Sequence, residues 1–164
     1  MIKILTTLLL LINLAFAKTP LENTIEGKWH SITRSVNNGT QTVEKEYLNL
    51  YNNNKFNLVL LVSLEKGDFF VKDLRIEVSG IWRAKYKSLI YIIEKINVPV
   101  AKEVYRINQQ SLRNLANNFK RMYETNKIHI NKINYLNSDK MTIVNEKGSE
   151  VSYSRSKSVP QRPF

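Results

Sequence analysis

The sequence predicts an all-β domain: an antiparallel meander of eight or nine strands that closes into a barrel, with one amphipathic helix inserted before the last three strands. Three observations predict this fold class. Short runs of β-branched and aromatic residues alternate with turn residues along most of the chain. The hydrophobic period changes from two to about 3.6 residues in the segment 111–125. An open sheet of so many strands would leave two exposed edges, so closure is expected.

The first seventeen residues are predicted to be a removable export signal. Lys3 supplies a positive charge, Ile4–Phe16 form a short apolar run, and Ala15 and Ala17 give the small-x-small pattern that signal peptidase reads. The run is shorter than the roughly 20 apolar residues that span a bilayer, which favours a cleaved signal over a retained anchor. We therefore expect cleavage after Ala17 and a periplasmic or secreted protein without a transmembrane span.

Composition limits the remaining chain to one domain. Cleavage leaves about 147 of the 164 residues. Residues 18–155 are predicted to form the barrel, and the tail, 156–164, is predicted to be disordered. The chain has no cysteine, which excludes disulfides, thiolate metal sites and a lipid-modified N-terminal cysteine. The export signal, the absence of cysteine and the frequent Asn, Lys and Ile together indicate a bacterial envelope protein.

The chain is strongly basic, with a net charge of +11, or about +10 once Lys3 is removed. Such a charge favours anionic partners, for example phospholipid head groups, acidic ligands or acidic proteins. Nucleic acid is not expected as a partner of an exported protein. The alternative interpretation is that the charge serves solubility alone.

The first three strands are predicted after a short polar lead, 18–26. Gly27–Ser35 and Thr42–Tyr51 flank Asn37-Asn38-Gly39, a strong hairpin signal because Asn and Gly tolerate positive φ. Lys55–Leu64 is the clearest strand, because apolar side chains occupy every second position. These side chains are Phe56, Leu58, Leu60, Val62 and Leu64.

The next predicted strands are Phe69–Ser79, Gly80–Lys85, Leu89–Asn97 and the short run Lys102–Asn108. Pro99 restricts its neighbourhood to an edge or a bulge. After the helix, the last three strands are predicted at Lys127–Tyr135, Lys140–Asn145 and Ser149–Arg155, which are separated by short turns.

Ser111–Thr125 is predicted to be the amphipathic helix, with Ser111 as its N-cap. Leu112, Leu115, Ala116, Phe119, Met122 and Tyr123 share one face. The other face carries Arg113, Lys120 and Arg121, which form a candidate basic surface for a partner. Two interpretations stay open: a helix packed on the barrel, or a mobile lid or membrane-surface helix.

Several segments resemble a known family. Ile25-Glu26-Gly27-Lys28-Trp29 looks like the Gly-x-Trp opening of the lipocalins and of bacterial lipocalin-like domains. The segment Gly80–Tyr91 is similar to the mid-barrel hairpin of the bacterial members, and 137–155 resembles their closing strands. The resemblance implies a lipocalin-like (calycin-type) exported barrel. It also implies that Arg155 lies over Trp29 beside Gly27 and closes one end of the barrel as a structural contact.

Residues for catalysis or metal binding are few. His30 and His129 are the two histidines. His30 is expected to point outward because it follows Trp29, and strand alternation explains His129. Glu44 and Glu46 share a strand face and are expected to form a solvated edge rather than a catalytic pair. No nucleophile or phosphate-binding motif is present in the sequence. We therefore expect no enzyme, no metal site and no cofactor.

Two functions fit the sequence. The first is a ligand-binding protein that carries a small apolar or amphipathic anion inside the barrel, with a Lys or Arg at its mouth. Its interior is predicted to contain Tyr47, Phe56, Leu58, Leu60, Trp82, Tyr91 and Tyr105. An ordinary packed core is the alternative interpretation of these residues. The second function is a non-enzymatic interaction protein, which uses its basic face and helix to dock on an envelope partner or an anionic membrane surface, or to act as an inhibitor.

Overall fold

The computed structural model describes residues 19–99 and 103–156 of the chain. The predicted signal segment and its cleavage site, and the predicted tail apart from Ser156, lie outside the described residues. The elements are α2 (Pro20–Ile25), β1 (Gly27–Asn37), β2 (Thr40–Leu50), β3 (Lys55–Lys66), β4 (Phe69–Lys85), β5 (Ser88–Asn97), β6 (Glu103–Tyr105), α3 (Gln109–Thr125), β7 (Ile128–Leu136), β8 (Lys140–Val144) and β9 (Glu150–Arg155).

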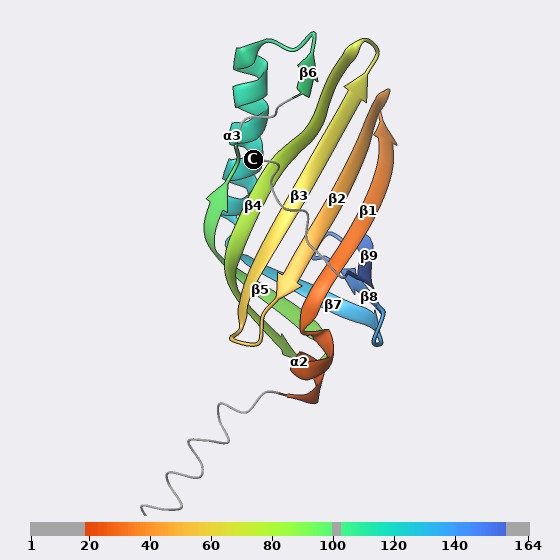
Figure 1. The fold of residues 1–164 in the computed structure, drawn as a ribbon, viewed down its shortest axis with the longest axis vertical. Helices are drawn as coiled ribbons and strands as arrows, with labels where there is room; N and C mark the ends of the chain where they lie inside the picture. The colour runs from red at the N-terminus through yellow and green to blue at the C-terminus, as the bar shows by residue number, and fades with distance from the viewer. Residues whose placement is uncertain (1–18, 100–102, 157–164) are drawn as a thin grey trace, which may run out of the picture.

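Eight antiparallel strands close into a barrel in the order β3-β2-β1-β9-β8-β7-β5-β4, and the pairing of β3 with β4 completes the ring. In Figure 1, β1 to β4 are long neighbouring arrows along the front, and β5 and β7 cross behind their lower part at a steep angle. β6 is an additional strand on β4, and α3 precedes β7, β8 and β9. The predicted all-β meander, its closure and the place of the helix are therefore confirmed.

The first hairpin forms where the sequence predicts it. Asn38 and Gly39 lie between β1 and β2 with φ of 49° and 74°. Two residues with positive φ match the right-handed twist of the flanking strands, so the turn fixes their register. β1 consequently pairs with β2 along its whole length, from Gly27 opposite Leu50 to Asn37 opposite Thr40.

β4 is one long strand, whereas the sequence analysis expects two strands with a boundary at Gly80. The pairing of β4 with β5 shifts register between Ser79 and Gly80, so the glycine lies at a bulge and the strand continues. A Cβ atom on Gly80 would overlap the backbone carbonyl oxygen of Ile92. The glycine therefore permits a close approach of two strands instead of ending one.

α2 is absent from the sequence prediction, which describes 18–26 as a polar lead. The Thr19 hydroxyl accepts a hydrogen bond from the Glu22 backbone N–H, and the Glu22 carboxylate accepts one from the Thr19 N–H. Pro20 occupies the first helical turn. This capping box satisfies N–H groups that have no partner within the helix. The Thr-x-x-Glu spacing in the sequence was the signal that could have predicted it.

α3 begins two residues before the predicted start. Asn108, not Ser111, is the N-cap, and its side-chain oxygen accepts a hydrogen bond from the Ser111 N–H at 2.8 Å. Leu112 is buried in the barrel core. Leu115, Phe119 and Tyr123 are partly buried and pack against the same core. The apolar face of α3 therefore covers the barrel, which agrees with the packed-helix interpretation.

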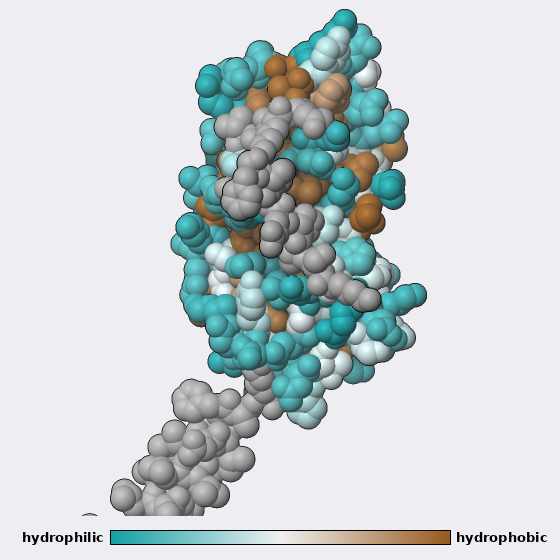
Figure 2. Space-filling view, in the orientation of Figure 1, coloured by the Kyte–Doolittle hydropathy of each residue, from teal (hydrophilic) through white to brown (hydrophobic). Residues whose placement is uncertain are grey.

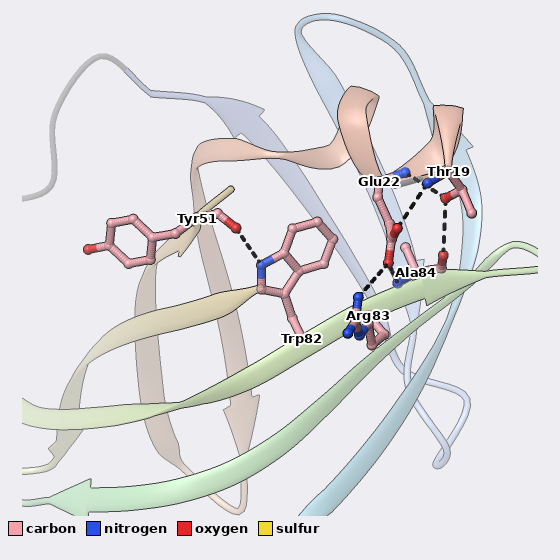
Figure 3. Close-up of polar contacts among 6 residues, drawn as sticks. All are labelled: Thr19, Glu22, Tyr51, Trp82, Arg83 and Ala84. Atoms are coloured by element: carbon pink, nitrogen blue, oxygen red, sulfur yellow. Dashed lines mark hydrogen bonds and ion pairs between the residues drawn. The ribbon is translucent and has the colours of Figure 1, made fainter. Parts of the chain in front are cut away.

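α2 lies at one end of the barrel (Figure 1), where Glu22 contacts Ala84 and Arg83 of β4 (Figure 3). Glu22 is nearly fully buried, accepts a hydrogen bond from the Ala84 N–H at 3.4 Å, and lies 3.9 Å from the Arg83 guanidinium. Trp29 donates its indole N–H to the Ile25 carbonyl at 2.7 Å. The indoles of Trp29 and Trp82 are fully buried beside α2 and the neighbouring strands, so this end is filled with side chains.

Arg155 stabilises the same end of the barrel, where it lies over Trp29 as the family resemblance implies. Its guanidinium carbon lies 4.1 Å from the ring centroid of Trp29. Nη1 and Nη2 donate to the carbonyls of Glu26 at 2.7 Å and Thr24 at 2.8 Å, and Nε donates to the carbonyl of Ser138. One side chain thus ties β9 to the end of α2 and to the β7–β8 turn.

Gly27 makes room for this guanidinium. Its φ is +129°, a conformation that favours glycine, and a Cβ atom there would overlap Nη1 of Arg155. The Gly-x-Trp segment and Arg155 therefore form one structural contact at the closed end of the barrel.

Candidate functional site

The barrel encloses a cavity of about 660 Å³ beneath the C-terminal part of α3. A volume of this size lies within the range of pockets that hold small molecules in proteins. Strands β2 to β5 and β7 to β9 all contribute to its lining. The apolar part of the wall includes Leu48, Phe56, Leu58, Val78, Ile93, Met122, Ile130, Ile143 and Val151.

The cavity opens between α3 and the β8–β9 turn. Arg121 and Met122 on α3 and Glu146 and Lys147 on the turn line the cavity and are exposed to solvent. Two basic side chains and one acidic side chain therefore surround the opening. This agrees with the expectation of a Lys or Arg at the mouth.

The cavity wall also carries a group of polar side chains, Glu46, Tyr91, Tyr123, His129 and Tyr153, which we call the polar cluster. The Tyr153 hydroxyl donates a hydrogen bond to the Glu46 carboxylate. The Tyr91 hydroxyl and the Nε2 atom of His129 are buried and have no hydrogen-bond partner among the described residues. Such groups are uncommon in folded proteins unless water or a ligand satisfies them.

Aromatic rings surround the polar cluster. The centroids of Phe56 and Tyr91 lie 5.0 Å apart with their planes tilted by 50°. The rings of Tyr123 and His129 lie 5.8 Å apart, also at 50°. Aromatic rings and polar side-chain atoms therefore line one cavity and come from four elements, β3, β5, α3 and β7.

Burial sets the electrostatics of the cluster. Desolvation raises the pKa of Glu46, the hydrogen bond from Tyr153 lowers it, and the nearby charge of Glu44 raises it again, with a net increase. Burial and the charge of Glu46 raise the pKa of Tyr91, Tyr123 and Tyr153. The phenols consequently stay neutral at physiological pH, and burial disfavours the charged form of Glu46.

The raised pKa of Glu46 predicts a pH dependence of stability. Because this pKa is higher in the folded protein than in the unfolded chain, the folded state binds more protons between the two pKa values. The free energy of unfolding should therefore fall as pH rises from the unfolded to the folded pKa, by about 1.4 kcal/mol for each pH unit between them. Urea unfolding of the wild type and of Glu46→Gln, from about pH 4 to 8, should show a relative loss of stability for the wild type alone. A stability difference that is constant with pH would contradict this.

No protein-family model matches the sequence, and no curated protein is similar to it. The closed eight-stranded barrel is compatible with a lipocalin-like fold, and membership of that family stays a prediction.

In the described residues, no helix is long and apolar enough to cross a membrane. Nor does this part of the chain contain a group of three or more His, Asp, Glu or Cys residues that could hold a metal ion.

The predicted ligand-binding residues separate into three groups. Phe56, Leu58 and Tyr91 line the cavity. Leu60 and Trp82 are buried in the packed core, where the Trp82 indole N–H donates to the Tyr51 carbonyl at 3.0 Å (Figure 3).

Tyr47 and Tyr105, the other two predicted residues, are not among the cavity-lining residues. Tyr47 alternates with Glu46 and Leu48, which line the cavity, so it points to the other face of β2. Tyr105 is half exposed on β6 and stacks on Phe70 at 5.6 Å.

The three residues of the predicted basic face do not all lie at the cavity. Arg121 contributes to the opening of the cavity. Arg113 and Lys120 are exposed on α3, where Lys120 lies 3.7 Å from Glu124, one turn along the helix. Of the three residues, Arg121 alone lines the cavity.

The expectation that Glu46 lies at a solvated edge is wrong. Glu46 lines the interior because it shares a strand face with Leu48 and Leu50, which are buried. Strand parity was the signal that could have placed Glu46 inside. His129 shares a face with Asn131 and Ile133, as strand alternation explains, and lines the cavity.

Proposed function

We propose that this protein is a non-enzymatic binding protein that holds one small amphipathic molecule in the barrel cavity, without a cofactor. The single observation that carries the proposal is the cavity of about 660 Å³, which is apolar on most of its wall and open between α3 and the β8–β9 turn. A barrel of eight strands is wide enough to hold one small ligand when side chains leave its interior partly empty.

The apolar cavity wall can contact an aliphatic chain or a ring system of a ligand. Burying about 200 Å² of apolar ligand surface would contribute about 5 kcal/mol to binding, before the loss of translational and rotational freedom is subtracted. The closed end packed around Trp29 and Trp82 supplies a rigid floor, so the ligand enters from the side of α3.

Arg121 and Lys147 support an anionic head group at the opening. Both side chains are exposed and border the cavity, so they can meet a carboxylate or phosphate that stays in contact with water. The predicted export signal, 1–17, supports a site of action in the bacterial envelope.

Filling the cavity tests the proposal. Leu58 lines the cavity, and replacing it with tryptophan places an indole in the space that the ligand would use. We expect Leu58→Trp to bind the apolar fluorescent dye N-phenylnaphthylamine at least about tenfold more weakly than the wild type, a loss of about 1.4 kcal/mol. Fluorescence titration measures both affinities.

Leu61→Trp is the matched control, because Leu61 lies three positions along β3 and does not line the cavity. It should bind the dye like the wild type. If Leu58→Trp unfolds, Val78→Phe on β4 fills the same cavity and replaces it in the test. Equal affinity for the wild type, the cavity variant and the control would place the dye elsewhere and refute the proposal.

A second candidate function rests on exposed aromatic residues near β6. Phe69, Phe70 and Tyr105 are between 38% and 52% exposed, and the Arg106 guanidinium lies 5.4 Å from the Tyr105 ring. Figure 2 shows hydrophobic residues gathered mainly in the upper half of the visible face. Exposed apolar surface bordered by charge favours docking on a partner protein or surface. Docking is therefore the function to test if the cavity takes no ligand.

A further inference from the structure

We infer that the ligand carries a positively charged amino group inside the barrel, where the Glu46 carboxylate and the surrounding aromatic rings hold it. This inference rests on the proposed function and adds the chemistry of the buried end of the ligand. Together with Arg121 and Lys147 at the opening, it defines the ligand as a zwitterionic amphiphile, with its amino group inside and its anionic group outside.

The Glu46 carboxylate has no cationic partner in the part of the chain that the structure describes. It accepts a hydrogen bond from Tyr153, and within the described residues it forms no ion pair with a lysine or arginine. The neighbouring Lys45 pairs with Asp73 at 3.3 Å instead. A carboxylate removed from water is costly unless an opposite charge and hydrogen bonds compensate it. A ligand ammonium would supply that charge.

The same cavity holds acceptors for the N–H groups of an ammonium ion. A primary ammonium group has three N–H donors. The Glu46 carboxylate, the Tyr91 hydroxyl oxygen and Nε2 of His129 offer three acceptors, of which the last two are buried without a partner. His129 accepts at Nε2 when its proton is on Nδ1, the tautomer that this assignment requires. An alcohol has a single O–H donor, so it can donate to only one of these three groups.

Aromatic rings form part of the cavity wall. The faces of aromatic rings carry negative potential and attract cations. Phe56 and Tyr91 form one pair of rings and Tyr123 and His129 another, and the Tyr153 ring lines the same cavity. Aromatic rings that surround a cation are a known protein environment for ammonium ligands, and the Glu46 carboxylate adds an opposite charge here. An anion at this depth would instead meet the like charge of Glu46.

The test compares two competitors of equal length, n-octylamine and n-octanol, by displacement of N-phenylnaphthylamine at neutral pH. The amine is charged and the alcohol is not, so their ratio isolates the charge. On the wild type, we expect octylamine to displace the dye at a concentration at least about tenfold lower than octanol. On Glu46→Gln, we expect the two concentrations to agree within about threefold.

Glu65→Gln is the matched control, because Glu65 is exposed on β3 and its replacement changes the net charge equally. It should keep the wild-type preference for the amine. Equal displacement by amine and alcohol on the wild type, with the dye bound, would overturn this inference and leave the proposed function standing. A preference for the amine that persists in Glu46→Gln would also overturn it. Failure of the dye to bind the wild type would refute the proposed function itself.

Discussion

Replacing Arg155 with alanine is expected to lower the free energy of unfolding by about 3 kcal/mol. The guanidinium donates hydrogen bonds to three backbone carbonyls, those of Thr24, Glu26 and Ser138, and covers the ring of Trp29. Hydrogen bonds from a charged donor are worth about 1.5–3 kcal/mol each, and the cation–π contact about 0.5–2 kcal/mol. Partial exposure of Arg155 reduces the sum, because water replaces some of the lost contacts.

Urea unfolding of Arg155→Ala, Arg155→Lys and Arg34→Ala measures this effect. Lysine keeps the charge but lacks the planar fork that reaches three carbonyls, so it should restore less than half of the lost stability. Arg34 is exposed on β1, and its replacement should change stability by less than about 0.5 kcal/mol. If Arg155→Ala were as stable as Arg34→Ala, the closed end of the barrel would not depend on this contact.

Replacing Gly80 with alanine is expected to destabilise the fold by at least about 3 kcal/mol. The added methyl group would overlap the carbonyl oxygen of Ile92 and would lie 3.0 Å from the backbone nitrogen of Glu94. Both atoms belong to the backbone of β5, so relief requires separation of β4 from β5 at the bulge. Excess volume in a packed region costs about 1–3 kcal/mol when side chains yield, and more when the backbone has to move.

Thermal or urea unfolding of Gly80→Ala, with Ser79→Ala as the neighbouring control, measures this cost. Ser79 precedes the bulge on the other face of β4, and its loss should cost less than about 1 kcal/mol. Gly80 pairs with Phe56 and Ile93, which line the cavity, so the displaced strands should also weaken binding of the dye. Similar stability of Gly80→Ala and Ser79→Ala would show that the two strands separate at little cost.

The strands were predictable because strand periodicity is local. Alternation in Lys55–Lys66 placed Phe56, Leu58 and Leu60 on one face, and Asn38-Gly39 placed the first turn. The boundary expected at Gly80 was wrong because a glycine that breaks a strand and a glycine that admits a neighbouring strand look alike in sequence. What distinguishes them is Ile92, which the sequence places twelve residues away and the fold places against Gly80.

The candidate site was only partly predictable, because its members come from separate strands and one helix. Phe56, Leu58 and Tyr91 could be placed inside by alternation. Tyr105 could not be placed, because β6 pairs with the N-terminal part of β4, at Phe70–Lys72, instead of joining the barrel wall. The charge of Glu46 favours a solvent-exposed position, whereas its strand parity with the buried Leu48 and Leu50 favours the interior. A carboxylate inside a barrel contradicts the usual solvent preference of glutamate, and such exceptions gather at functional sites.

A native mass spectrum of the intact protein shows whether the cavity holds a ligand. The protein would be purified without denaturant from the cells that make it. We expect a discrete added mass on the folded protein, which is lost in Leu58→Trp and retained in Leu61→Trp. A bare chain mass that stays bare after incubation with envelope lipid extract and with N-phenylnaphthylamine would contradict this expectation.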